Sequence, residues 1–289
     1  MSQDTPILFR QFVPADIPFA MELKNLAGWN QTEQDWSGYL EFEPEGCFVA
    51  EREGRAAGTA ITIRYGREAG WIGMVLVHPR FRRAGIGTRL LNHAIGHLRS
   101  RGVSAIKLDA TPVGRTVYLP LGFQDEYAVK RYEGVLVKTA GAEPGPDVVS
   151  LARPAADVVA AFDRDCFGVE RGRVLDALRR RDPSWCWIAR SRTGIAGYLM
   201  AREGHEAVQL GPWVSRDEGI AARLLRALAR HTGGRRMLVD IPAPNGNGQA
   251  LMQREGFVIQ RNFTRMYLGT NTHPGDPASI FGTGGAEIG

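Results

Sequence analysis

The sequence predicts a mixed α/β protein built from two copies of one domain, and three observations support this prediction. The chain has 289 residues, of which 44% are hydrophobic and 23% charged, so it falls within the range of globular proteins and has the length of about two domains. Apolar patterns typical of strands and of helices alternate along it, which favours a sheet covered by helices. Sequence markers also recur at the same spacing in both halves, which indicates an internal repeat.

The repeat is visible in three spacings. Each half contains a tetrapeptide that starts with Cys and ends with Ala, at 47–50 and at 186–189. In both halves a glycine, at 58 or 197, stands eleven positions after the Cys. A Leu-Leu pair ends 31 positions before a Gly-Phe pair, from 91 to 122 and from 225 to 256, and an arginine follows each Gly-Phe by eight, at 131 and 265. We infer an N-terminal domain over 1–138 and a C-terminal domain over 148–270. The Gly and Pro residues of a linker over 139–147 exclude a long helix or a central strand there.

The first copy is predicted to follow the order β-α-α-β-β-β-α-β-α-β. We expect a strand at 7–12, a helix from 14 to 26, a helix at 32–42, strands at 47–52, 56–65 and 70–77, a long helix at 86–98, a strand at 106–110, a short helix at 115–121 and a closing pair of strands within 123–133. The long helix carries an apolar stripe and stops at Gly102. Since it separates two strands, those strands should be parallel.

The second copy is predicted to repeat this order. We expect helices at 156–162 and 174–180, strands at 185–190, 194–201 and 207–214, a helix at 219–231 and a strand at 237–241. Residues 271–289 are poor in apolar side chains and rich in Gly, so we expect a flexible tail there.

Several classes of protein and of site are not expected. No run approaches the roughly 18 apolar residues that a bilayer span requires, and the N-terminal segment lacks the features of a signal peptide, so we expect a cytoplasmic protein without a membrane partner. The three cysteines are widely spaced and should be buried. His93 and His97 lie one helical turn apart, but a third ligand is missing, so no metal is expected. The net charge of +5 is spread along the chain and suits a phosphorylated small ligand, so we expect no nucleic-acid partner.

The segment from Gly73 to Leu91 is the most informative about chemistry, because it runs from a strand through a glycine loop into a helix. Gly85 and Gly87 allow the backbone to approach a ligand at the start of a helix, where free N–H groups and the helix dipole favour a pyrophosphate. Arg82 and its neighbour add charged donors. A dinucleotide-binding loop would have a third glycine, which is missing here, and a simple helix-capping turn is the alternative interpretation.

A second segment, Tyr118-Leu119-Pro120-Leu121-Gly122-Phe123, follows after another strand. With this Tyr-x-x-x-Gly-Phe pattern, the R-x-x-G-x-G loop and the order of elements, residues 7–134 resemble the GNAT superfamily of acyl-CoA N-acyltransferases. The repeat further resembles bacterial tandem GNAT proteins, in which a more degenerate acyltransferase domain follows the first.

The resemblance implies a site for acetyl-CoA in the first copy. The strand end Val75, Leu76 and Val77 would bind the pantetheine arm through its backbone. The loop that would hold the pyrophosphate consists of Arg82, Arg83, Ala84, Gly85, Ile86, Gly87 and Thr88. Tyr118 would bind the cofactor sulfur and protonate the departing thiolate, which a phenol beside a thiolate can do; packing of the ring against the sheet is the alternative. Thr111 stands where the family often has an asparagine that binds the cofactor arm.

The acceptor amine must lose a proton, and Glu33, Asp35 and Asp109 are the candidate bases. Each also has a structural interpretation: Asp35 fits a capping box with Thr32, Glu33 suits the first turn of a helix, and Asp109 ends a strand.

In the family the acceptor pocket is covered by the loop between the first two helices. We therefore expect Trp29, Asn30 and Trp36 to bind the substrate, although core packing explains Trp36 equally well.

The second copy departs from the pattern. Asp217 and Glu218 stand where a pyrophosphate would lie, Leu251 replaces the tyrosine, and Pro212 removes a backbone donor. We predict that this copy is catalytically silent and completes the acceptor pocket, stabilises the first copy or senses a ligand.

The function that the resemblance implies is N-acetyl transfer from acetyl-CoA to a primary amine of a small molecule by direct attack. A protein or peptide acceptor and a non-catalytic acyl-CoA sensor are the alternatives, and the chain is expected to be a monomer or homodimer.

Overall fold

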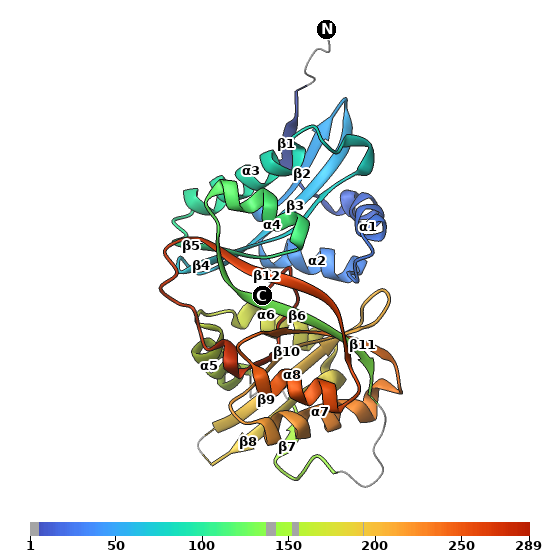
Figure 1. Ribbon diagram of the computed structural model, residues 1–289, viewed down its shortest axis with the longest axis vertical. Coiled ribbons are helices and arrows are strands. Elements are labelled where there is room, and N and C mark those ends of the chain that lie inside the picture. The colour runs from blue at the N-terminus through green and yellow to red at the C-terminus, as the bar shows by residue number, and fades with distance from the viewer. Residues whose placement is uncertain (1–5, 137–142, 152–155, 193) are drawn as a thin grey trace.

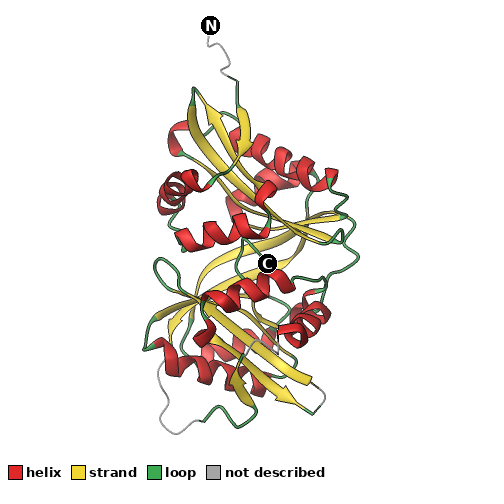
Figure 2. Ribbon diagram, turned by 180° about the vertical axis from the view of Figure 1, so that it is seen from behind, coloured by secondary structure: helices red, strands yellow, loops and turns green. Residues whose placement is uncertain are grey.

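The computed structural model describes residues 6–136, 143–151, 156–192 and 194–289. The chain forms two lobes that lie one above the other along the long axis, and two long strands cross between them (Figure 1). Figure 2 shows from behind that helices cover the strands in both lobes. Within these described ranges, no helix is long and apolar enough to span a bilayer.

The N-terminal half contains the elements in the predicted order. Its strands are β1 (Leu8–Gln11), β2 (Cys47–Arg52), β3 (Arg55–Tyr65), β4 (Ala69–Val77), β5 (Ala105–Ala110) and β6 (Gln124–Val135). Its helices are α1 (Ile17–Leu26), α2 (Glu33–Phe42), α3 (Ile86–Ser100) and α4 (Pro112–Tyr118), with 3-10 turns at Pro14–Asp16, Pro44–Gly46, Pro79–Phe81 and Leu119–Leu121. Helix α4 begins three residues earlier than predicted, because Thr111 caps it and Pro112 occupies its first turn.

The C-terminal half repeats the same elements. Its strands are β7 (Val148–Ser150), β8 (Cys186–Ser191), β9 (Gly194–Arg202), β10 (Val208–Ser215), β11 (Arg236–Pro242), β12 (Val258–Gly269) and β13 (Ile280–Gly282). Its helices are α5 (Ala156–Phe167), α6 (Gly172–Arg181), α7 (Glu218–Thr232) and α8 (Gly246–Arg254), with 3-10 turns at Pro183–Trp185 and Pro277–Ser279. Positions 139–142 of the expected linker lie outside the described residues, so the domain boundary stays a prediction.

The two halves share one sheet because they exchange their closing strands. The strand order is β1-β2-β3-β4-β5-β12-β6-β11-β10-β9-β8-β7, so β12 of the second half inserts between β5 and β6 of the first. The predicted parallel pairs are confirmed as β4 with β5 and β10 with β11. The closing strand pair expected within 123–133 is wrong: this segment is the single strand β6, whose neighbours β11 and β12 both come from the other half.

The expectation of a flexible tail at 271–289 is also wrong. Strand β13 pairs with β10, and the chain then ends at the junction of the lobes (Figure 1). Phe281 and Ile288 are each 2% exposed. Low apolar content predicts disorder only if the few apolar side chains stay in solvent, and here they are buried. Tyr65 and Trp71 of the first half also donate hydrogen bonds to the carbonyl groups of Ile288 (2.7 Å) and Ala286 (2.9 Å).

The cysteines and the histidine pair pack as ordinary side chains. All three cysteines are free and buried, as predicted. His93 stacks on Phe9 at 4.9 Å between ring centroids, and both His93 and His97 meet the edge or face of Phe48.

Candidate active site

Strands β4 and β5 separate at the centre of the first half. They pair in parallel only from Ala69 to Trp71 of β4, so the rest of β4 has no strand partner on that side. A β-bulge then bends β4 near Met74, whose backbone takes a φ of 51°. The buried Thr59 hydroxyl donates to the Met74 carbonyl at 2.9 Å and holds the bulge in place. Backbone groups of β4 beyond the bulge therefore line an opening in the sheet.

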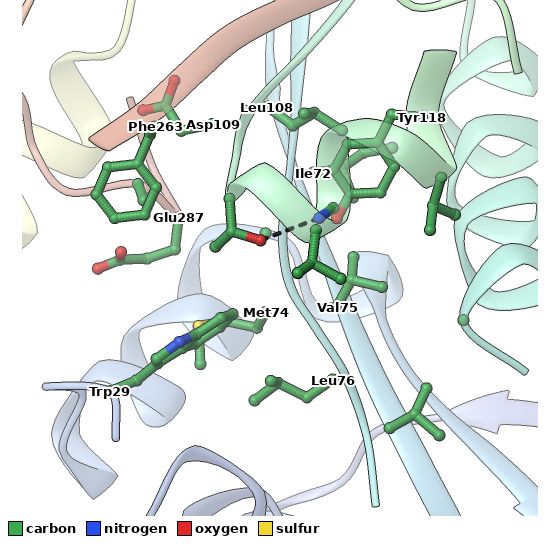
Figure 3. A pocket seen from close by; sticks show the side chains of 18 of the residues that line it. Trp29, Ile72, Met74, Val75, Leu76, Leu108, Asp109, Tyr118, Phe263 and Glu287 are labelled. Carbon is green, nitrogen blue, oxygen red and sulfur yellow. Dashed lines mark hydrogen bonds between the residues drawn. The ribbon is translucent and has the colours of Figure 1, made fainter. Parts of the chain in front are cut away.

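A cavity of about 640 Å³ occupies this opening (Figure 3). Its walls come from the two strands and α4, namely Ile72, Gly73, Met74, Val75, Leu76, Val77, Leu108, Asp109, Thr111, Val113, Gly114, Val117 and Tyr118. One end is formed by loop and helix residues Arg82, Arg83 and Gly87, and the other by Trp29, Gln31, Arg131, Arg261, Phe263, Ala286 and Glu287. We call the first set the outer end of the cavity and the second set its inner end. The strand residues Val75 to Val77, predicted to bind the pantetheine arm, line this cavity.

The outer end carries a run of free backbone donors. None of the N–H groups from Arg83 to Thr88 makes a hydrogen bond to another described residue. Arg83 and Gly85 have positive φ values of 63° and 73°, which turn the loop so that it leads into α3. Such a concave run of N–H groups at the start of a 15-residue helix is suited to binding phosphate.

The predicted loop residues divide into two groups at this end. Arg82, Arg83 and Gly87 line the cavity, whereas Ala84, Gly85, Ile86 and Thr88 do not. Ile86 is buried in the core, so only its backbone can contribute to the cradle. Arg82 Nε donates to the Val77 carbonyl at 3.2 Å, which ties the loop to the strand end.

Tyr118 and Thr111 both face the cavity from α4. The Thr111 hydroxyl accepts a hydrogen bond from the Gly114 N–H at 3.1 Å, so it caps the helix and keeps its own proton free to donate. The Tyr118 ring packs beside Phe123 at 6.0 Å, and its hydroxyl makes no hydrogen bond within the described chain. Burial raises the pKa of Tyr118 to about 12, which keeps the phenol protonated and able to act as an acid.

The three predicted bases are not positioned alike. Glu33 is exposed on α2 and does not line the cavity. Asp35 is 6% exposed, also lies outside the cavity lining, and forms the capping box with Thr32. Burial alone would raise the pKa of Asp35, but Arg202 and Arg181 outweigh it and hold the pKa below its usual range. These positions argue against Glu33 and Asp35 as bases.

Asp109 lines the cavity but is fully engaged elsewhere. Both of its oxygens accept hydrogen bonds from Arg265 of β12 at 2.8 Å. Burial raises its pKa despite this arginine. Each oxygen keeps a second lone pair, but the charge of Arg265 opposes protonation of this carboxylate, which argues against Asp109 as the base.

The predicted substrate residues also separate. Trp29 lines the cavity (Figure 3). Asn30 does not: its side-chain oxygen and nitrogen bond the backbone of Glu206 and Ala207, so it joins the two halves. Trp36 stacks on Phe12 at 5.2 Å in the core, which supports the packing interpretation.

The residues that the sequence did not predict come largely from the second half. Arg261 and Phe263 reach the inner end on β12, and Ala286 and Glu287 reach it from the segment after β13. Their only sequence signal was the arginine repeated after each Gly-Phe, which marks β6 and β12 as equivalent. The second half therefore completes the pocket of the first, one of the roles predicted for it.

The equivalent opening in the second half is filled. Strand β13 pairs with β10, and the Thr283 N–H next to it donates to the Asp240 carbonyl of β11 at 2.9 Å. The Asp217 side chain caps α7 by accepting from the Ile220 N–H. Four positions before Gly256, as Tyr118 is before Gly122, stands Met252 and not the expected Leu251, and both side chains are buried in the core. In the described residues of this half, strand β13 therefore fills the opening, and a carboxylate occupies the start of the helix.

The chain is similar in sequence to known proteins. Residues 17–123 match a sequence model of the acetyltransferase (GNAT) family, and residues 159–282 match a model of an acetyltransferase (GNAT) domain. A holothin acyltransferase from Pseudoalteromonas sp. (strain SANK 73390) is 24% identical over 242 residues, which cover 83% of this chain and 81% of the relative.

Two solved structures share the whole fold. The structure of a putative acetyltransferase from Pyrococcus horikoshii superposes with a TM-score of 0.84 at 24% identity and covers 98% of this chain and 96% of its own. A tandem GNAT protein from the clavulanic acid biosynthesis pathway superposes with a TM-score of 0.66 at 16% identity, over 91% and 98% of the two chains. Both domains and their arrangement are therefore common to these folds.

Proposed function

The chain belongs to the GNAT acetyltransferases and carries two domains of that family in tandem, and we propose that its first domain transfers an acetyl group from acetyl-CoA to a primary amine of a small molecule. This proposal rests on one observation. A single cavity connects the free N–H groups of residues 83–88 with the Tyr118 hydroxyl and with a pocket that could hold an acceptor. Acyl-CoA is the donor that this family uses, and the acetyl form is our proposal.

The residues of the first domain fit acetyl-CoA. The N–H groups from Arg83 to Thr88, together with the Arg82 guanidinium, would hold the pyrophosphate. The unpaired side of β4 from Val75 to Val77 would bind the amide groups of the pantetheine arm. When bound, acetyl-CoA supplies an acetyl group activated as a thioester.

Direct attack by the amine agrees with the lining of the cavity. No cysteine or serine occurs among the described residues that line it. The hydroxyl groups that do line it belong to Thr111, which caps α4, and to Tyr118, the proposed acid. The three cysteines are buried elsewhere, and burial raises the pKa of Cys47 and of Cys186 to about 12. These thiols are therefore protonated and inert at neutral pH.

Tyr118 is the proposed acid. Its protonated hydroxyl lines the cavity beside the β4–β5 opening and has no competing partner in the described chain. It can therefore give its proton to the thiolate that leaves, a contribution worth roughly 10²- to 10⁴-fold in rate.

A small acceptor is favoured by the inner end of the cavity. Residues Ala286 and Glu287 close this end, and the aromatic rings of Trp29 and Phe263 line it. The relative named holothin acyltransferase is named for a single acceptor, which is consistent with this choice.

Calorimetric titration of the purified chain with acetyl-CoA tests the proposal. We expect one site per chain, because the second half lacks an opening for the cofactor. Two sites would show that the second copy binds the cofactor as well, and no binding would refute the acyltransferase proposal. Binding without turnover of any amine would instead favour the sensor.

A further inference from the structure

We propose that the inner end of the cavity binds a primary amine that also carries an anionic group, with Arg261 binding the anion and Glu287 accepting the amine proton. This inference rests on the proposed acetyl transfer and names the chemical class of its acceptor. It also assigns the base that Glu33, Asp35 and Asp109 do not supply.

One cation at the inner end of the cavity has no counter-charge in the described chain. Arg131 forms a bidentate pair with Asp240 at 2.7 Å, and Asp109 forms one with Arg265 at 2.8 Å. Arg261 has no ion pair or hydrogen-bond partner in the described parts of the chain, although it lines the cavity.

This free guanidinium is in an unfavourable environment. Burial lowers the pKa of Arg261, and the nearby Arg131 lowers it further. A partly buried cation beside another cation is stabilised when an anion binds it, and a guanidinium binds carboxylate or phosphate through paired hydrogen bonds.

The strand geometry directs Arg261 and Phe263 to the same side. They lie two residues apart on β12, so their side chains share one face of the strand, and both line the cavity. The Arg131 guanidinium covers the Phe263 ring at 5.0 Å. The anion site and an aromatic wall are therefore neighbours.

Glu287 is held at the bulge of β4 on the side of the cavity that also carries Trp29 and Phe263 (Figure 3). Its backbone packs so tightly on Gly73 that a Cβ there would lie 2.9 Å from the Glu287 Cα. Arg202 donates to one carboxylate oxygen, Oε1, at 2.7 Å and fixes its orientation. The Glu287 backbone N–H also interacts with this carboxyl group. No other described residue donates a hydrogen bond to the second oxygen, Oε2, which can therefore accept a proton.

The surroundings of Glu287 suit a base. Burial raises its pKa although Arg202 opposes this, so its basicity is greater than that of an exposed glutamate. The other charged or titratable groups that face it are Asp35 and Tyr39 of α2, Tyr65 of β3 and Arg131 of β6. Gln31 adds a buried side-chain oxygen without a partner in the described chain at the same end of the cavity.

The reaction balances with these two residues. The amine nitrogen bonds to the acetyl carbon as the C–S bond breaks, Glu287 takes the amine proton and Tyr118 provides a proton to the thiolate. At the end of each turnover Glu287 returns its proton to solvent and Tyr118 regains one.

Matched pairs of amines test the anion site. We would compare kcat/KM for tyrosine with tyramine, phenylalanine with phenethylamine and glucosamine 6-phosphate with glucosamine, and include a lysine-rich peptide. The anionic member of at least one pair should be preferred at least tenfold, and Arg261→Gln should reduce that preference by about ten- to a hundredfold, the value of a charge-assisted hydrogen bond. Arg192→Gln, which removes an exposed arginine, should keep the preference. Equal or lower use of the anionic members, including no use of either, would overturn the inference.

Glu287→Gln tests the base. We expect kcat at neutral pH to fall by roughly 10²- to 10⁴-fold with a smaller change in KM, and Glu287→Asp to recover part of the rate. In the wild type, kcat should fall as the pH drops through the raised pKa of Glu287, and the variant should lose this acidic limb. An unchanged kcat with the limb intact would refute the assignment.

Acetyl-CoA binding, measured for every variant, separates the two proposals. If the wild type does not bind acetyl-CoA, the proposed function fails. If it binds and acetylates neutral amines equally well, only the acceptor class is wrong. Retained acetyl-CoA binding by Glu287→Gln also shows that this variant is folded.

Discussion

Arg265 of β12 and Asp109 of β5 form a buried, bidentate ion pair that joins the second half of the chain to the first, with both N–O distances at 2.8 Å. Arg131 of β6 and Asp240 of β11 form the equivalent pair in the opposite direction, at 2.7 Å. Each pair connects residues that face one another across adjacent strands. The exchange of closing strands is thus held by the same interaction twice.

Breaking one of these pairs should destabilise the whole chain. Asp240→Asn leaves the Arg131 guanidinium buried without its counter-charge, so we expect the free energy of unfolding to fall by about 3–5 kcal/mol. The double variant Arg131→Met with Asp240→Leu should recover most of this loss, because an apolar pair needs no counter-charge. Urea unfolding measures both, and a single variant as stable as the wild type would contradict the prediction.

Tyr118→Phe should reduce the rate of acetyl transfer without abolishing cofactor binding. Loss of the proton donor is expected to lower kcat by roughly 10²- to 10⁴-fold at neutral pH. Steady-state kinetics and calorimetry with acetyl-CoA measure the two effects separately. Tyr267→Phe, which removes a hydroxyl bonded to Gln124 outside the cavity, is the control and should leave kcat unchanged.

Gly85→Asp should weaken acetyl-CoA binding. A carboxylate at the start of α3 would accept from the free N–H groups, as Asp217 does at the start of α7, and would repel the pyrophosphate. We expect the Kd to rise about tenfold or more, equivalent to at least 1.4 kcal/mol. Gly96→Asp places the same charge on an exposed site of the same helix and should leave the Kd unchanged. Equal effects of both changes would show that the loop does not hold the phosphates.

Asp35→Asn should alter stability in a manner that depends on pH. Because Arg202 and Arg181 hold the pKa of Asp35 below its value in the unfolded chain, about 3.9, its carboxylate stabilises the fold above that pH. The variant should therefore be less stable than the wild type at pH 7, and the difference should shrink as the pH falls below about 4 and through the lower folded-state pKa. Urea midpoints at pH 7, 5 and 3 measure this. A difference that grows towards acid pH would contradict the assignment of Asp35 as a structural ion-pair partner.

Ile288→Ala should destabilise the chain as a core substitution does. Ile288 is 2% exposed and packs in the core between the two halves, so we expect a loss of about 2–5 kcal/mol. Val258→Ala, at a side chain 66% exposed, is the control and should change little. If thermal unfolding gave equal midpoints for both variants, the segment after β13 would not be part of the folded core.

Local patterns in the sequence determined most of the secondary structure and identified several of the residues that line the cavity. The alternation of apolar residues predicted β1 to β5 and β8 to β11, and the two glycines at 85 and 87 marked the loop that leads into α3, because these features depend on residues a few positions apart. Tyr118 and Trp29, which the sequence analysis also singled out, both line the cavity.

Only the tertiary structure decided how the two copies share their strands and which acids are free to react. From the sequence, Asp35 can be interpreted as a general base or as a helix-capping residue. Its ion pairs with Arg181 and Arg202, which lie 146 and 167 residues away in the chain, favour the structural role. Arg261 and Glu287 carry no local mark of function, since one lies within an ordinary strand and the other in a Gly-rich segment. The role that we propose for them is inferred from burial and from which charges remain unpaired, and both depend on contacts between residues far apart in the chain.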